Sequence, residues 1–271
     1  GSESLQKKSP QKERGRDLLG PRRYEKEIYL LERLALETYF QGCFAVSWLK
    51  FIEKRISGEP LQYILGEWSF MGFDFKVGRG VLIPRDDTEV VVNLCIDFLK
   101  NRTDKKTVDL CSGSGAIAVA LDKISGAEVT AVEIDETAFS YLETNVKENN
   151  SSVKPVMADA LEICETFADG GLDLIVSNPP YIKSADIETL QKEVQLEPRL
   201  ALDGGEDGYD FYREIVSRWS RKLKKGGALA FELGENQADA VKALMTDKGF
   251  SDFKISLDFG GVQRAIIGTL L

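Results

Sequence analysis

One feature restricts the fold of this chain more than any other: from Pro84 onward, short apolar runs alternate with longer stretches of helical spacing. Strands that alternate with helices form a mostly parallel sheet that is covered by helices on both faces. The last two runs are joined through Gly260-Gly261 without a helix, which predicts an antiparallel pair at the end of an α/β fold. The predicted strands are residues 107–110, 129–134, 155–158, 172–177, 228–233, 253–259 and 265–270, and the predicted helices are residues 88–100, 116–123, 136–148, 209–222 and 236–248.

The chain before Pro84 has a different texture. Residues 24–56 carry apolar side chains at helical spacing, and we predict a small helical domain over residues 1–57 that begins with a basic arm. Residues 58–84 alternate aromatic and polar side chains between glycines, which predicts a β-hairpin linker to a main domain over residues 85–271. The arm fits either a solvated segment or a docking surface for ribonucleoprotein or an acidic partner. Its basic residues are Lys7, Lys8, Lys12, Arg14, Arg16, Arg22, Arg23 and Lys26.

The composition excludes several classes of function. The 271 residues include no histidine, which removes the commonest general base and the commonest metal ligand. Hydrolases that use a Ser-His-Asp or Cys-His arrangement are therefore excluded, and we expect no metal site. The four cysteines form no C-x-x-C pair, and no apolar run approaches the roughly 20 residues that span a bilayer, so we predict a reduced, cytoplasmic chain with no membrane partner. The net charge of −9 disfavours stable binding of nucleic acid.

A glycine-rich turn at residues 111–115 joins the first predicted strand of the main domain to a helix. Glycines let a ligand approach the main chain closely, and the helix N-terminus adds free N–H groups. Glu133 ends the next strand, where an acid can hold two ribose hydroxyls. Asp109 in the turn region would repel a pyrophosphate but suits an ammonium and a sulfonium, which favours a methyl donor over a dinucleotide and leaves both open. Asp159 is placed either to receive an adenine amino group or to cap a helix.

A second turn, Asn178-Pro179-Pro180-Tyr181, directly follows the apolar run at residues 172–177. Two prolines end the strand because neither carries an N–H, and they make the loop stiff. An amide nitrogen is a poor nucleophile because its lone pair is delocalised into the carbonyl. The side-chain oxygen of Asn178 and the main-chain oxygen of Pro179 are acceptors for its two N–H groups, and the Tyr181 ring can stack on the planar group. Attack on a sulfonium methyl then depends on positioning and fixed dipoles, which suits a chain without histidine.

At these residues the chain resembles the protein-(glutamine-N5) methyltransferases that modify peptide chain release factors, the HemK/PrmC family. In three places it carries other residues than the family usually has: Asp86 for a proline, Cys111-Ser112 for Gly-Thr, and Glu133 for Asp. The resemblance covers about residues 57–271 and includes the segments 58–64, 82–89, 197–202, 204–208 and 231–234, together with Asp258-Phe259 and Arg264.

The resemblance implies a class I, Rossmann-like methyltransferase domain with a seven-stranded sheet, preceded by a small N-terminal helical domain. It implies S-adenosylmethionine as the cofactor and, as substrate and partner, the glutamine of the Gly-Gly-Gln loop in a peptide chain release factor. The expected catalytic residues are Asn178, Pro179, Pro180 and Tyr181, which would hold the glutamine amide. The candidate cofactor-binding residues are Asp109, Cys111, Ser112, Gly113, Ser114, Gly115, Glu133, Asp159, Asn178 and Ala160, the last two through the resemblance alone.

Three alternatives remain at this stage. The turn at residues 178–181 also suits an exocyclic base nitrogen of DNA or RNA, although the acidic balance and the lack of an evident basic groove count against it. A non-catalytic adapter could keep the fold, but the intact turn counts against decay. Gly113-x-Gly115-x-x-Ala118 also satisfies the dinucleotide fingerprint.

Overall fold

The computed structural model describes residues 44–271, with side chains from Lys50 onward. Residues Glu53–Leu271 form one compact unit, and helix α2 spans Phe44–Ile56. The predicted helical domain over residues 1–57 and its basic arm therefore lie mostly outside the described residues. The limits drawn at residues 57 and 84 stay predictions. None of the helices within residues 44–271 combines the length and the apolar character that a membrane span needs.

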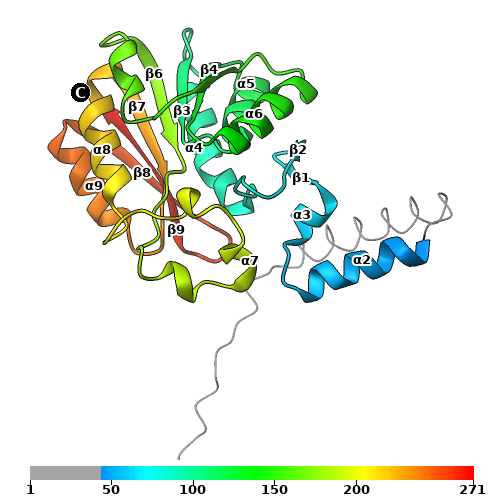
Figure 1. The fold of residues 1–271 in the computed structure, drawn as a ribbon. Helices are drawn as coiled ribbons and strands as arrows, with labels where there is room; N and C mark the ends of the chain where they lie inside the picture. Colours follow the sequence, from blue (N-terminus) through cyan, green and yellow to red (C-terminus); the bar gives the residue numbers. More distant parts are fainter. Residues whose placement is uncertain (1–43) are drawn as a thin grey trace, which may run out of the picture. The chain divides into compact units, whose positions relative to one another are not determined.

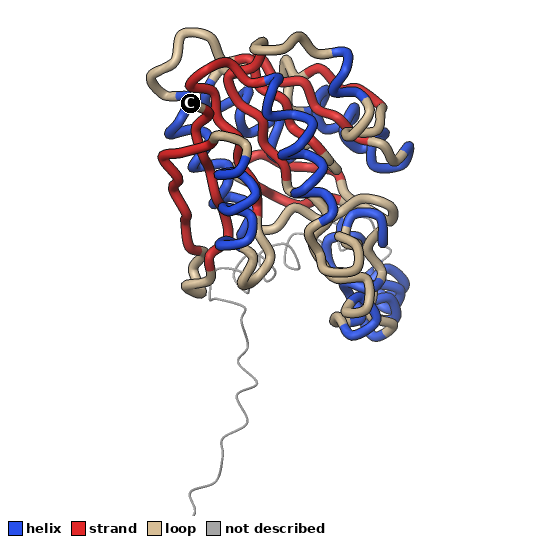
Figure 2. Tube along the Cα trace, turned by 90° about the vertical axis from the view of Figure 1, so that its left-hand side faces the viewer, coloured by secondary structure: helices blue, strands red, loops and turns tan. Residues whose placement is uncertain are grey.

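A seven-stranded sheet organises the compact unit, in the order β5-β4-β3-β6-β7-β9-β8. Figures 1 and 2 show this sheet among the helices that pack on it. Strands β3 to β7 pair in parallel, whereas β9 runs antiparallel to both β7 and β8. The predicted α/β fold and its antiparallel end are confirmed. The strands are β3 (Lys106–Leu110), β4 (Glu128–Glu133), β5 (Lys154–Met157), β6 (Leu172–Ser177), β7 (Leu223–Glu232), β8 (Phe250–Leu257) and β9 (Gln263–Leu270).

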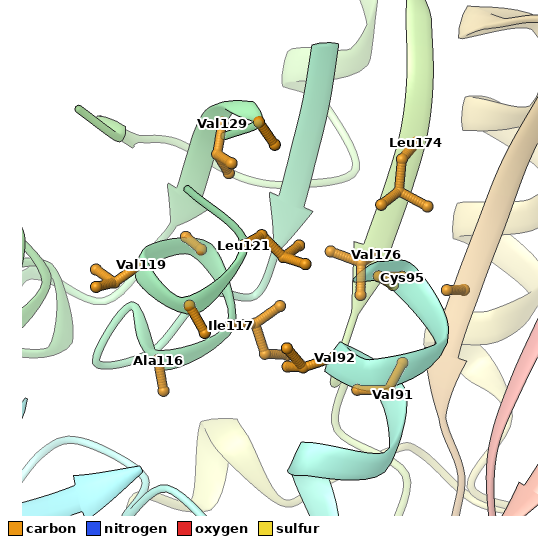
Figure 3. Packing of buried hydrophobic residues seen from close by; sticks show 14 of the residues in the cluster. Val91, Val92, Cys95, Ala116, Ile117, Val119, Leu121, Val129, Leu174 and Val176 are labelled. Carbon is orange, nitrogen blue, oxygen red and sulfur yellow. The ribbon is translucent and has the colours of Figure 1, made fainter. Parts of the chain in front are cut away.

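Helices cover both faces of this sheet, as alternating strands and helices require. Leu174 and Val176 of β6 pack into one apolar cluster with α4, α5 and α6, and Ile175 between them packs into a second cluster with α8 and α9. Figure 3 shows side chains of the first cluster, among them Val176 and Cys95. The helices are α4 (Glu89–Leu99), α5 (Ala116–Ser125), α6 (Glu136–Glu148), α7 (Lys192–Gln195), α8 (Asp210–Trp219) and α9 (Ala238–Asp247), with short 3-10 turns η1 (Asp86–Thr88), η2 (Ile163–Thr166), η3 (Ile187–Thr189), η4 (Arg199–Ala201) and η5 (Ser220–Lys222).

The linker region holds a two-stranded antiparallel hairpin of β1 (Glu67–Phe70) and β2 (Phe73–Lys76). Phe70 and Phe75 of this hairpin are buried in the first cluster, so the hairpin packs on the main domain rather than standing free. A short helix that the sequence did not predict, α3 (Leu61–Leu65), precedes it. Asn145 of α6 fixes the hairpin, since its amide accepts from Lys76 N at 2.6 Å and donates to Lys76 O at 3.1 Å.

The largest boundary error concerns β7. It begins at Leu223, five residues before the predicted start at Ala228, because the Lys-Lys-Gly-Gly sequence between them reads as a turn. In the sheet this polar stretch continues the strand at its amino end, far along β7 from the edge where the candidate site lies. The error therefore leaves the site prediction untouched.

Candidate active site

A cavity of about 240 Å³ opens at the carboxyl ends of strands β3, β4 and β6. Open parallel sheets bind ligands at this edge. Both turns that the sequence singled out contribute to its wall. The predicted residues that line the cavity are Cys111, Ser112, Gly113, Ser114, Glu133, Asp159, Ala160, Asn178 and Pro180, whereas Asp109, Gly115, Pro179 and Tyr181 are not part of the lining.

The glycine-rich turn has a main chain that only small residues tolerate easily. Gly115 has a φ of 83°, and a Cβ placed there would lie 2.5 Å from Leu142 Cδ1. Cys111 also has a positive φ, 59°, which costs an L-residue with a side chain free energy. Asn145 donates to Ser114 O at 2.9 Å, so α6 holds this turn as well as the hairpin.

Three main-chain N–H groups of this turn have partners within the protein. Ser112 N donates to Val132 O at 3.0 Å, Gly113 N to Glu133 Oε2 at 2.8 Å, and Gly115 N to Ser112 O at 2.8 Å. A pyrophosphate is normally bound by free N–H groups at such a turn. Because these three N–H groups are already used, the turn suits a cation or a neutral ligand better than a dinucleotide.

Glu133 ends β4 and is held tightly by the main chain. Its carboxylate accepts from Gly113 N, Ile134 N and Asp135 N, each at 2.8 Å. Burial raises its pKa while these hydrogen bonds lower it. A carboxylate has about four acceptor positions, so one remains for a ligand hydroxyl at the cavity wall. The arrangement leaves room for one ribose hydroxyl, whereas the sequence predicted a contact with two.

Asp109 lies inside strand β3 rather than in the turn, and its side chain is completely buried. The sequence placed Asp109 both in the predicted strand at residues 107–110 and in the turn region, and the second placement is wrong because the residue is paired within β3. Neither carboxylate oxygen has a hydrogen bond of normal geometry, although Ser112 and the Ala118 N–H are close enough to lower the pKa. Burial outweighs both and raises the pKa of Asp109 to about 8. A buried, unpaired carboxyl behind the wall would be stabilised by a cation in the cavity.

Asp159 closes a turn and also lines the cavity. Its Oδ1 accepts from Leu161 N at 2.7 Å, but the helix that it was expected to cap is absent, because the next element is the 3-10 turn η2 with Glu162 as its N-cap. The neighbouring Ala160 is fixed from the other side, since Trp219 Nε1 donates to Ala160 O at 2.8 Å. The turn therefore positions Asp159 at the wall without removing it from contact with a ligand.

The second turn continues directly from β6, whose six residues are all buried. Ser177 Oγ donates to Leu110 O at 2.7 Å and ties the ends of β6 and β3 together. Asn178 at the cavity wall donates through Nδ2 to Thr88 Oγ1 at 3.4 Å. Pro179 and Pro180 are buried, so the turn is fixed by packing as well as by proline geometry.

Tyr181 is held behind the cavity wall by polar groups. Its hydroxyl donates to Glu232 Oε1 at 3.2 Å, and its main-chain oxygen accepts from Gln237 Nε2 at 3.1 Å. Burial raises the pKa of the Tyr181 hydroxyl well above its ordinary value. The stacking of its ring on a substrate stays a prediction.

A loop at residues 197–208 packs against this turn. Gly204 N donates to Ile182 O at 2.8 Å, and a Cβ on Gly204 would lie 2.7 Å from Tyr181 Cα. Glu197 at the start of the loop is buried; it accepts from Ile83 N at 3.0 Å and pairs with Arg85. The loop thereby joins the second turn to the segment before α4.

Sequence reasoning assigned no role to two residues that hold the second turn, Thr88 and Glu232. Both belong to segments that carried the family resemblance, but nothing local indicates which side chains they meet. The available signal is that Glu232 ends β7 beside β6, where a charged residue terminates an apolar strand. Other lining residues that were not predicted include Arg85, Asp135, Leu200 and Phe211.

The charges at the cavity wall favour a cationic ligand. Glu133, Asp135 and Asp159 line it, and Arg85, the basic residue in the lining, is paired with Glu197. The remaining lining is largely apolar and suits a flat aromatic base. These features fit S-adenosylmethionine, with Glu133 toward the ribose, Asp159 toward the adenine and Asp109 toward the positive charge.

Comparisons with known proteins agree with this chemistry. The family model of the methyltransferase small domain matches residues 85–199. A release factor glutamine methyltransferase of Thermodesulfovibrio yellowstonii is 38% identical over 80% of this chain and 78% of its own length, and one of Geobacter sulfurreducens is 43% identical over 81% and 76%. One of Fusobacterium nucleatum is 41% identical over 77% of this chain, which spans 59% of that relative's length.

Solved structures show the same fold at lower identity. A methyltransferase from Pyrococcus furiosus has a TM-score of 0.55 and 22% identity, covering 74% of this chain and 90% of its own. The hMettl16 catalytic domain in complex with an RNA hairpin has a TM-score of 0.60 and 14% identity, covering 73% of this chain and 75% of its own. Both likenesses concern the fold of the described domain.

Proposed function

Because this chain belongs to the release factor glutamine methyltransferase family, we propose that it transfers a methyl group from S-adenosylmethionine to the side-chain amide nitrogen of a release-factor glutamine. The enzyme is an S-adenosylmethionine-dependent methyltransferase. The glutamine would be that of the Gly-Gly-Gln loop. The observation that carries the proposal is that Asn178 and Pro180 line the same cavity as the glycine-rich turn.

The bound cofactor supplies an electrophilic methyl group on a sulfonium. The protein's task is then to present an amide nitrogen in line with that methyl group. Asn178 Oδ1 and the main-chain oxygen of Pro179 are the acceptors for the two N–H groups of the glutamine amide. The buried prolines keep these acceptors in place, so little reorganisation is needed during the reaction.

Side chains that titrate near neutrality have no direct part in the transfer itself. The amide proton can leave to solvent after the methyl group has moved, because the methylated nitrogen is then far more acidic. Glu133 and Asp159 line the cavity and bind the cofactor, and Asp109 lies behind the wall. The negative charges at the wall attract the positive donor and hold the neutral product less tightly.

The test is to incubate the protein with S-adenosylmethionine and a release factor and to examine the loop glutamine by mass spectrometry. One added methyl group on that glutamine, absent when glutamine is replaced by alanine, is the expected result. Parallel incubations with DNA and RNA use a labelled methyl group. Label in nucleic acid alone would replace this substrate with an exocyclic base nitrogen.

A further inference from the structure

A buried carboxylate beneath the second turn has no place in the function described so far. Glu232 is the last residue of β7 and is 2% exposed. Its Oε1 accepts from the Tyr181 hydroxyl at 3.2 Å, whereas its Oε2 has no hydrogen bond of normal geometry among the described residues. Burying a carboxylate with one oxygen unsatisfied is costly in free energy, so its presence at this point needs a reason.

Resting on the proposed function, we propose that Glu232 is a positioning residue for the transfer. Acting through the hydroxyls of Thr88 and Tyr181, it fixes the side-chain amide of Asn178 and the ring of Tyr181 in the orientation that presents acceptors to the substrate.

The argument for Asn178 depends on the single hydrogen of the Thr88 hydroxyl. Asn178 Nδ2 donates to Thr88 Oγ1, and the Thr88 hydroxyl is close enough to the Glu232 carboxylate to lower its pKa, although the two do not form a hydrogen bond of normal geometry. A hydroxyl donates one hydrogen bond and accepts others. When that hydrogen is directed at Glu232, Thr88 can only accept from Asn178. The amide then turns its N–H₂ toward Thr88 and leaves Oδ1 as the acceptor for the substrate.

Protonation of Glu232 would reverse this chain of hydrogen bonds. A neutral carboxyl can donate to Thr88 Oγ1, and the Thr88 hydroxyl can then donate to Asn178. Asn178 would turn its oxygen toward Thr88 and present N–H₂ to the substrate, which repels the N–H groups of a glutamine amide. Transfer therefore requires the ionised form of Glu232.

The groups around Glu232 set where this change occurs. Arg264 of β9 and the hydroxyls of Thr88 and Tyr181 favour the ionised form, whereas burial and the neighbouring Asp87 oppose it. Arg264 is itself paired with Asp258 at 2.9 Å, and Tyr212 of α8 donates to the main-chain oxygen of Glu232 at 2.9 Å. Burial is the largest effect and raises the pKa of Glu232 to about 7. Because the chain has no histidine, few of its side chains can ionise near neutral pH, and Glu232 is one that does.

The experiment measures kcat at saturating S-adenosylmethionine from pH 5.5 to 9, with a release factor as substrate. For the wild type, kcat should rise with pH through about 7. Glu232→Gln imitates the protonated form, so its kcat should be lower by about tenfold or more at pH 8 and should lose this rise. Cofactor affinity, measured by calorimetry, should stay within about threefold of wild type, because Glu232 does not line the cavity.

A matched pair at Thr88 keeps the proposal testable even if Glu232→Gln folds poorly. Thr88→Val removes the hydroxyl at constant shape and should lower kcat by about tenfold, whereas Thr88→Ser keeps the hydroxyl and should recover most of the loss. Equal activity of Val and Ser variants, or a Glu232→Gln variant with the wild-type pH profile, would overturn the positioning role. A wild type that fails to methylate the release factor at any pH would instead overturn the proposed function.

Discussion

The turns after β3 and β6 lie at the same edge of the sheet, but the protein holds them by different means. The turn at residues 111–115 is held by hydrogen bonds to groups in the turn and at the end of β4. Its N–H groups donate to Val132 O, Glu133 Oε2 and Ser112 O. The turn at residues 178–181 is held by groups from distant parts of the chain: Thr88, the loop at residues 197–208, and β7 with the start of α9.

The difference follows from what each turn must do. A cofactor site can be built from main-chain groups and one acidic residue at the next strand end, because the ligand is always the same. A site that orients an amide must fix side-chain and main-chain oxygens in direction as well as in position, and this requires outside support. We therefore expect changes around the first turn to act on cofactor affinity, and changes around the second to act on kcat.

The largest effect should come from Asn178→Ala. It removes an acceptor that works in the transition state, and loss of one such fixed group lowers kcat by about 100-fold or more. Cofactor affinity should change little, because Asn178 is one of many lining residues. Single-turnover assays with a release factor and calorimetry with S-adenosylmethionine measure the two quantities separately. Unaltered kcat would remove Asn178 from the mechanism.

A smaller loss is expected from Gly204→Ala in the supporting loop. The new Cβ would lie 2.7 Å from Tyr181 Cα and 2.8 Å from Pro180 O, which are main-chain atoms that cannot move aside locally. We expect kcat to fall about tenfold and the free energy of unfolding to fall by about 1–3 kcal/mol.

The matched control for Gly204 is Gly260→Ala at the β8–β9 connection, where the nearest atom to the new Cβ is a side-chain oxygen of Asp258 at 3.1 Å. This variant should keep its kcat. If both glycine variants lose kcat equally, the loss reflects general destabilisation and the support from residues 197–208 is not specific.

The same difference explains what could be predicted from the sequence. Alternating apolar runs predicted the sheet, its antiparallel end and the two turns, because each depends on residues close together in the chain. The contacts of Thr88, Glu197 and Glu232 could not be predicted, since 90 residues separate Thr88 from Asn178 and 51 separate Tyr181 from Glu232. The complete burial of Asp109 could not be predicted for a similar reason, since it depends on β4 and β6, the two strands that pair with β3.

A pH-dependent effect is expected at Asp109. Its pKa of about 8 lies above the value of about 3.9 in an unfolded chain, so the folded protein keeps a proton that the unfolded chain has lost. Without cofactor, stability relative to Asp109→Asn should therefore fall as pH rises from about 4 to 8 and stay low above it.

Cofactor binding should show the opposite trend at the same residue. Above pH 8 the ionised Asp109 attracts the cation, and affinity of the wild type should exceed that of Asp109→Asn by about fivefold. At pH 6 the carboxyl is neutral and the two proteins should bind alike. Calorimetry and thermal unfolding at both pH values check the two trends, and a pH-independent ratio of affinities would show that Asp109 does not sense the cofactor's charge.

The smallest effect concerns Cys111, which stands where the resembling family usually has glycine. Its φ of 59° is a strained conformation for a residue with a Cβ, whereas glycine adopts it freely. Glycine also has more conformational freedom in the unfolded chain, which offsets part of the stability gained by removing the strain. Cys111→Gly should therefore raise the free energy of unfolding by no more than about 1 kcal/mol in urea titrations. Asn150→Gly, at a φ of 48° outside the cavity, should gain less because asparagine tolerates this region, and it should leave cofactor affinity alone. A loss of stability in Cys111→Gly would mean that the half-buried thiol contributes packing that outweighs the strain, and the first turn would then also depend on a side chain for its shape.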